Sequence, residues 1–191
     1  MSFYQPQTSI LFLALVTLLF TSCRKEGAEN ANSETVTSAP ALKTFNLNMY
    51  TGLSSQLSWE LQQARAATAK YQQFKNAVKD GYVDINVISE NMGYHYMRTS
   101  IVDANFEITK PEILVYNKDD DGNFELVAVE YAIPLNLPRP EGFTGSNDVW
   151  NDTSGFPFWL LHAWVWEYNP LGVFNPTNPN VHLHQNLESG W

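Results

Sequence analysis

The sequence contains a single cysteine, Cys23, among its 191 residues. One cysteine excludes an intramolecular disulfide, so the folded part of the chain must be held together by its hydrophobic core alone. Hydrophobic residues make up 44% of the chain and aromatic residues 14%, which is enough apolar material for such a core. We therefore expect a globular domain without covalent cross-links.

Basic residues are scarce as well. Eleven lysines and arginines stand against twenty aspartates and glutamates, which gives a net charge of −9. Affinity for a phosphate backbone rests on lysine and arginine, so this balance argues against a nucleic-acid partner. It argues in the same way against binding to a membrane surface through charge.

The chain also lacks an apolar run that is long enough to cross a membrane. Residues 10–20 are uncharged and apolar, but they number only eleven, whereas a transmembrane helix needs about 20 residues. A run of this length followed by small residues is typical of an export signal. Residues 1–22 are therefore predicted to be a signal peptide.

Thr21, Ser22 and Cys23 resemble the lipobox of bacterial lipoproteins, in which small residues precede a cysteine that carries the lipid. The resemblance implies that Cys23 is the lipidated first residue of the mature protein, with palmitate among its acyl chains. Phe20 departs from the pattern, which usually has leucine there, and no lysine or arginine precedes the apolar run. The alternative is a plain secretory signal followed by an incidental cysteine.

Residues 23–44 carry Cys23 and then a segment that is rich in polar and small residues, with almost no large apolar side chain. That composition is typical of a solvated tether. Residues 45–191 then form a single globular domain, because their number suffices for one core and is short for two.

Apolar periodicity predicts the elements of this domain. Residues 57–78 place apolar side chains at spacings of three or four, which predicts one main amphipathic helix that ends near Gly81. Four later segments have the apolar pattern of strands: 83–87, 112–116, 124–133 and 158–168. We expect an α+β fold in which the helix packs on a mostly antiparallel, curved or barrel-like sheet.

Three polar residues interrupt the strand-like segments: His95, Glu130 and His162. A carboxylate is rarely buried without a partner, because removing it from water is costly. Two histidines and one carboxylate are also the ligand set of many zinc and non-haem iron sites. We predict that these three residues form a site for a divalent transition metal and, through it, for a small ligand.

Strand alternation makes their positions interior. It places Glu130 on the strand face of Leu126, and His162 on the face of Trp164 and Trp166. Their spacing in the sequence does not show that the three residues lie together, however. The alternative is a buried hydrogen-bond network in which Glu130 orients one histidine.

Two variants of the metal prediction use His95 alone or with a neighbour. Met97 points the same way as His95 in a strand, which would suit a soft copper site. A single histidine such as His95 also serves as an axial ligand of haem in many proteins. Near the chain end, His182 and His184 would share a face of an extended segment and could complete a metal site, although we expect a surface tail.

The loop at residues 117–123 has some features of a calcium site. Asn117, Asp119, Asp121 and Gly122 match the first positions of an EF-hand loop, but Ala128 stands where the bidentate glutamate belongs. The flanks also read as strands, so we expect a hairpin turn.

Aromatic residues gather in the second half of the chain, next to loops that are rich in glycine and proline. Phe143 and Trp150 lie in such a loop and are our candidates for lining a ligand pocket.

Several segments together resemble a group of uncharacterised secreted bacterial proteins. The resemblance covers about residues 60–180 and is carried by DGYVDI at 80–85, MGYHY at 92–96, VAVEYAIP at 127–134, LHAWVW at 161–166 and NPLGVF at 169–174. It implies one recurring domain and transfers no activity to any residue.

The sequence as a whole predicts a lipoprotein of the cell envelope, anchored on the exported side of a membrane through Cys23. A histidine and glutamate site for a metal or a small ligand is the first functional hypothesis, and no motif specifies a reaction. The alternatives are a non-enzymatic binding protein with an aromatic-lined pocket and a structural envelope component whose protein partner is unknown.

Overall fold

The computed structural model describes residues 46–183. The predicted signal peptide, Cys23 and the tether lie outside the described residues, as does His184. Within residues 46–183, no helix has the length and apolar character that are needed to cross a membrane.

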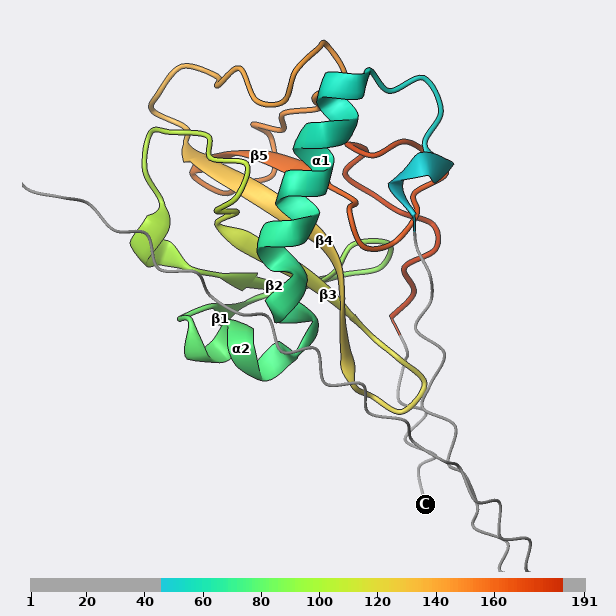
Figure 1. Cartoon of the computed structure of the whole chain (residues 1–191). Helices are drawn as coiled ribbons and strands as arrows, with labels where there is room; N and C mark the ends of the chain where they lie inside the picture. Colours follow the sequence, from blue (N-terminus) through green and yellow to red (C-terminus); the bar gives the residue numbers. More distant parts are fainter. Residues whose placement is uncertain (1–45, 184–191) are drawn as a thin grey trace, which may run out of the picture. The chain divides into compact units, whose positions relative to one another are not determined.

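A five-stranded antiparallel sheet organises the domain (Figure 1). Its strands follow chain order: β1 (Val83–Ser89), β2 (Gly93–Met97), β3 (Ile113–Lys118), β4 (Phe124–Pro134) and β5 (Phe158–Ala163). Each strand pairs with the next, and the expected hairpin is the β3–β4 pair. The α+β fold is confirmed, and the sheet is open rather than closed into a barrel, because β1 and β5 each pair with a single neighbour among the described strands.

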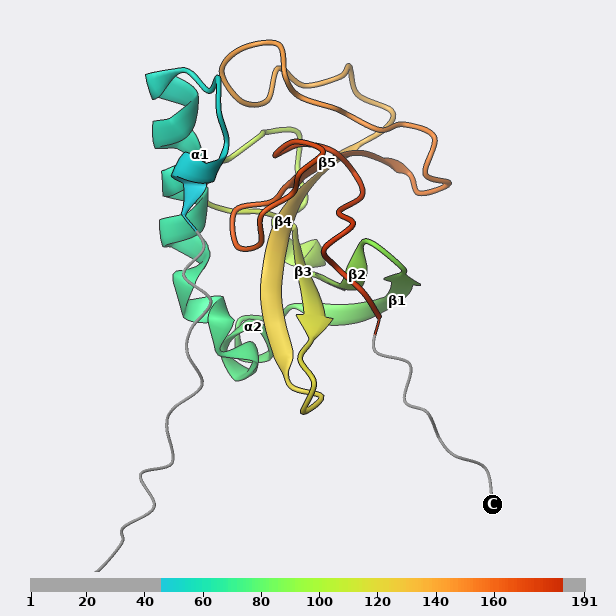
Figure 2. The ribbon, with the colours of Figure 1, turned by 90° about the vertical axis from the view of Figure 1, so that its right-hand side faces the viewer.

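The main helix, α1 (Ser55–Thr68), lies along one face of the sheet (Figure 2). It begins where the hydroxyl of Ser54 accepts the backbone N–H of Leu57, which satisfies one of the donors that a helix start leaves free. Its buried positions include Leu57, Leu61 and Ala64, as the periodicity predicts.

The prediction of one continuous helix as far as residue 78 is wrong. After α1 the chain forms a 3₁₀ turn, η2 (Ala69–Gln72), and then a separate short helix, α2 (Phe74–Lys79). Gln73 between them has extended backbone angles, so the helical phase is lost there. Ala77 is buried as a result, whereas Val78 is 53% exposed.

The two faces of the sheet bury different cores. The face toward α1 carries a large cluster that includes Leu114, Tyr116, Val129, Tyr131 and Leu161. The opposite face carries a smaller cluster that includes Met97, Ile113, Val115, Ala128, Leu160 and Trp164. Alternation along each strand assigns neighbouring residues to opposite faces.

A β-bulge in β4 changes one predicted position. Val115 pairs with Ala128, but Tyr116 pairs with Leu126, so Val127 is an extra residue in the ladder. Leu126 therefore belongs to the helix-side cluster and Ala128 to the other one. The expectation that Leu126 shares a face with Glu130 is wrong, because period-two counting does not see a bulge.

Trp166 also departs from the predicted alternation. Strand β5 ends at Ala163, so the pattern beyond it no longer applies. The indole N–H of Trp166 donates to the hydroxyl of Thr68 on α1 at 3.0 Å, and the guanidinium of Arg65 lies 3.9 Å from the ring centroid. Trp166 thus packs with the helix instead of sharing the face of His162.

Candidate metal and ligand site

His95, Glu130 and His162 lie together on the sheet face that is turned away from α1. Glu130 on β4 and His162 on β5 are direct cross-strand partners. His95 on β2 pairs with Val115, whose partner on β4 is two residues before Glu130. The three side chains reach the same point because three strands of one sheet present them on the same face.

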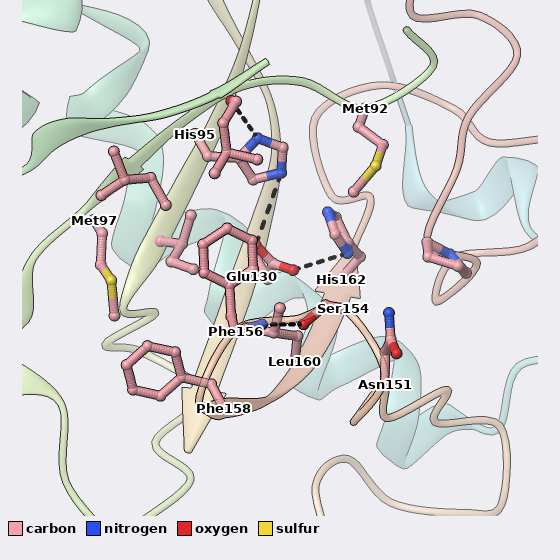
Figure 3. A pocket seen from close by; sticks show the side chains of 14 residues that line it. Met92, His95, Met97, Glu130, Asn151, Ser154, Phe156, Phe158, Leu160 and His162 are labelled. Carbon is pink, nitrogen blue, oxygen red and sulfur yellow. Dashed lines mark hydrogen bonds and ion pairs between the residues drawn. The ribbon is translucent and has the colours of Figure 1, made fainter. Parts of the chain in front are cut away.

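The carboxylate of Glu130 lies between the two imidazole rings (Figure 3). Its Oε1 is 3.2 Å from Nδ1 of His162, and its Oε2 is 3.8 Å from Nε2 of His95. One ligand atom from each residue lies within 4.8 Å of the other two. Donors around a tetrahedral zinc ion, about 2.0 to 2.2 Å from it, stand about 3.3 to 3.6 Å apart. The contact between Glu130 and His162 is already close to this length, whereas donor atoms up to 4.8 Å apart must move closer to share one ion.

One histidine is oriented by the backbone. Nδ1 of His95 lies 3.0 Å from the carbonyl oxygen of Val87 on β1, an acceptor that requires this nitrogen to carry the proton. Nε2 of His95 then keeps its lone pair on the side of Glu130. A metal-binding histidine is commonly held in this way by its second nitrogen.

Two nitrogen atoms of the site lack partners. Nε2 of His95 and Nε2 of His162 are buried and make no hydrogen bond within the described residues. A buried polar atom without a partner is costly, and most such atoms in folded proteins are satisfied. The unpartnered Nε2 of His95 lies on the side of Glu130 and can take a further partner there, whereas the nitrogen of His162 that faces Glu130 is Nδ1.

Burial opposes charge on all three groups. It raises the pKa of Glu130 to about 8 and lowers the pKa of His162 to about 3, with His95 adding to the second shift by repulsion. The pKa of His95 is lowered as well, again through burial. Burial therefore disfavours an ion pair between Glu130 and either histidine, and within residues 46–183 no lysine or arginine pairs with Glu130.

A pocket of about 270 Å³ opens above the three residues. Side chains from all five strands line it, and most are apolar, including Ile85, Met97, Phe158 and Leu160. The loop before β5 adds Asn151, Ser154 and Phe156 to the wall (Figure 3). The three polar residues of the site thus share a pocket with mostly apolar walls.

Phe143 and Trp150 lie elsewhere. Both are buried in the helix-side core, where they pack against Phe106 at centroid distances of 5.1 and 6.0 Å. Neither lines the 270 Å³ pocket. Core packing accounts for both side chains, and a ligand-lining role for them stays a prediction.

His182 stands apart from the site. Its Nδ1 lies 2.9 Å from Oε1 of Glu90, and both side chains are more than half exposed. The hairpin loop at 117–123 is a turn in which Asp119 accepts the backbone N–H groups of Asp121 and Asn123, as expected.

Several residues of the pocket were not foreseen from the sequence. Asn151, Ser154 and Phe156 belong to a loop without periodicity, so no pattern placed them beside the strands. Glu112 was also missed as a buried acid: its Oε2 accepts the N–H of Ala132 at 3.0 Å, and burial raises its pKa to about 7. Its position at the edge of an apolar run was the one available signal.

Comparison of the chain with protein-family models, with curated proteins and with solved structures found no significant match in any of the three. The functional argument therefore rests on the site itself.

Proposed function

We propose that this protein is a lipid-anchored component of the bacterial cell envelope whose domain binds a divalent transition metal ion through His95, Glu130 and His162. The ion in turn binds a small molecule in the pocket above it. The clustering of two buried histidines around one buried carboxylate, with Nδ1 of His162 and the unpartnered Nε2 of His95 facing that carboxylate, is the observation that carries this proposal.

The chemistry of the donor set supports a metal of the zinc or iron type. Neutral imidazole nitrogen and carboxylate oxygen are the ligands of zinc sites that keep an open coordination position, and of the three-residue sites of non-haem iron. Three protein ligands leave room for water or for a ligand atom. The pocket lies over this open side and gives a small molecule access to it.

A bound metal ion would also compensate the negative charge of the Glu130 carboxylate. Desolvation disfavours the carboxylate anion, and none of the described basic residues compensates it. A divalent cation bound at the two imidazoles would favour the ionised form. The energetic cost of burying Glu130 is then offset by metal binding.

The test is elemental analysis of the full chain, purified from the cell fraction that contains it and reconstituted with zinc. We expect close to one metal ion per chain in the wild type and almost none in His95→Ala or His162→Ala. The matched control is His182→Ala, because His182 also pairs with a glutamate but lies on the surface. A wild-type protein that takes up no metal, or variants that retain it, would contradict the proposal.

A second candidate is metal-free binding of an apolar molecule in the same pocket. Phe156 and Phe158 favour it, because both present aromatic rings to the chamber. Elemental analysis together with binding of a hydrophobic probe such as toluene separates the two candidates. Binding of the probe to protein without bound metal supports the second.

The membrane anchor needs its own experiment, because it rests on the pattern around Cys23. Cells that express the full chain are labelled with radioactive palmitate and fractionated. We expect label and membrane association in the wild type and the loss of both in Cys23→Ser. Unlabelled wild-type protein would point to a plain secretory signal.

A further inference from the structure

We propose that the small molecule bound at this site is a monoanion with a compact apolar body, which places its anionic group on the metal and its body against the pocket wall. This inference rests on the proposed metal site and names the class of ligand that the site takes.

The formal charge of the metal-loaded site favours an anionic ligand. A divalent ion with one carboxylate and two neutral imidazoles carries a net charge of +1. Isolated charge is costly in a buried, apolar environment, and the three ligands are at most 4% exposed. One further negative charge on the ligand makes the site neutral.

Within the described part of the chain, the pocket wall has no cationic side chain that could bind this anion in place of the metal ion. Among the described residues that line the pocket there is no lysine and no arginine. The metal would be the single cationic group in the chamber, so anion binding should depend on it. A ligand with two or more charges would leave the excess charge against apolar side chains.

One residue of the pocket wall, Asn151, offers a side-chain N–H donor for a ligand oxygen. Oδ1 of Asn151 accepts from the backbone and the hydroxyl of Thr153 at 2.9 and 3.0 Å, which orients the amide. Figure 3 shows the amide nitrogen of Asn151 on the side of His162. A carboxylate with one oxygen on the metal can accept an N–H from Asn151 with its other oxygen.

The size and the walls of the pocket define the body of the ligand. A dry cavity of ~150 Å³ is large enough to bind benzene, and this pocket measures about 270 Å³. It therefore takes an aromatic ring or a short branched chain together with one headgroup. Ile85, Met97, Phe158 and Leu160 supply the apolar contacts.

The experiment is a calorimetric titration of the full, zinc-loaded chain with three probes: benzoate, benzyl alcohol and acetate. Benzyl alcohol keeps the ring without the charge, and acetate keeps the charge without the ring. We expect benzoate to bind at least tenfold more tightly than either, and at least tenfold more tightly than it binds the metal-free chain.

A wall variant tests the location. Ile85 lies half-buried on the edge strand β1 and lines the pocket without being one of the three proposed ligands. Ile85→Trp should keep its zinc and lose at least tenfold in benzoate affinity. Circular dichroism checks its folding, and Phe158→Ala, which removes a wall contact without added bulk, gives a second test with the same expected direction.

The outcomes distinguish a failure of the proposed metal site from a failure of the proposed ligand class. A chain that binds no zinc overturns the proposed function. A chain that binds zinc but prefers benzyl alcohol to benzoate, or binds benzoate equally well without metal, overturns the anion inference alone. Equal affinity for acetate and benzoate, or unchanged benzoate binding in both wall variants, overturns the apolar body and its placement.

Discussion

Glu130 and His162 stand directly opposite each other on β4 and β5, with Oε1 of the glutamate 3.2 Å from Nδ1 of the histidine. Cross-strand neighbours on one face of a sheet are held at contact distance by the backbone ladder. The pair is therefore fixed by the sheet, and His95 is added to it from β2. This arrangement yields a pH dependence, a metal dependence and a structural requirement that can each be measured.

The metal-free protein should lose stability as the pH rises from 6.5 to 8. Burial raises the pKa of Glu130 from 4.5 to about 8, so in this range the folded state holds a proton that the unfolded state has released. Stability falls with pH wherever the folded state binds more protons. The folded state is half deprotonated at pH 8, so the loss from pH 6.5 to 8 is roughly 1.6 kcal/mol, somewhat less than the full slope of about 1.36 kcal/mol per unit would give.

Urea unfolding of the metal-free full chain, followed by tryptophan fluorescence at both pH values, measures this loss. Glu130→Gln keeps the shape and removes the titration, so its stability should change by roughly 1.6 kcal/mol less than that of the wild type. The smaller contribution of Glu112, whose pKa burial raises to about 7, is common to both proteins and cancels. Glu125→Gln, an exposed carboxylate on the same strand, is the control that should behave like the wild type. Parallel pH profiles for wild type and Glu130→Gln would contradict the assigned pKa.

Metal should stabilise the folded chain. A ligand that binds only the folded state adds about 2.7 kcal/mol when its free concentration is 100 times the dissociation constant. We expect zinc at that excess to raise the midpoint of urea unfolding in the wild type and in His182→Ala, and to leave His162→Ala unchanged. Equal shifts in all three proteins would assign the effect to zinc bound elsewhere.

Gly93 is required at the start of β2, two residues before His95. Its φ is +100°, and a Cβ atom placed there would lie 2.3 Å from the carbonyl oxygen of Tyr116. Gly93→Ala should therefore shift β2, lower stability by more than 2 kcal/mol and weaken zinc binding. Gly122→Ala is the matched control, because Gly122 also has a positive φ but open space around it. It should cost about 1 to 2 kcal/mol and leave zinc affinity unchanged, and a Gly93 variant that binds zinc normally would show that β2 tolerates the clash.

The packing of α1 can be tested at two neighbouring positions. Leu61 is fully buried against the sheet, whereas Trp59 is 54% exposed. Leu61→Ala should lower the free energy of unfolding by about 2 to 5 kcal/mol through lost burial and the resulting cavity. Trp59→Ala should change it by about 0.5 kcal/mol or less. Denaturant unfolding of both variants decides this, and comparable losses would mean that Trp59 makes a contact in solution.

The sequence was sufficient for the features that depend on local patterns. The spacing of Leu57, Leu61 and Ala64 predicted the helix face, and alternation predicted the β3–β4 hairpin. The apolar residues around Glu130 and His162 likewise predicted burial of both, because β4 and β5 are buried on both faces at these positions. The export signal and Cys23 likewise rest on local pattern, and they stay predictions.

Other features depended on contacts that no local pattern contains. The bulge at Val127 places Leu126 on the other face, and the extended backbone at Gln73 divides the helix. Neither irregularity changes the apolar spacing that was read from the sequence. Phe143 and Trp150 lie in a loop, as expected, but both are buried and pack against Phe106.

Convergence of the three polar residues is the clearest example. Nothing in the spacing of positions 95, 130 and 162 relates them, and their separations of tens of residues fit many topologies. The strand order β1-β2-β3-β4-β5 and its register place these side chains, from β2, β4 and β5, in contact on one face of the sheet. The sequence determined which residues are costly to bury, and the pairing of strands decided that they are buried together.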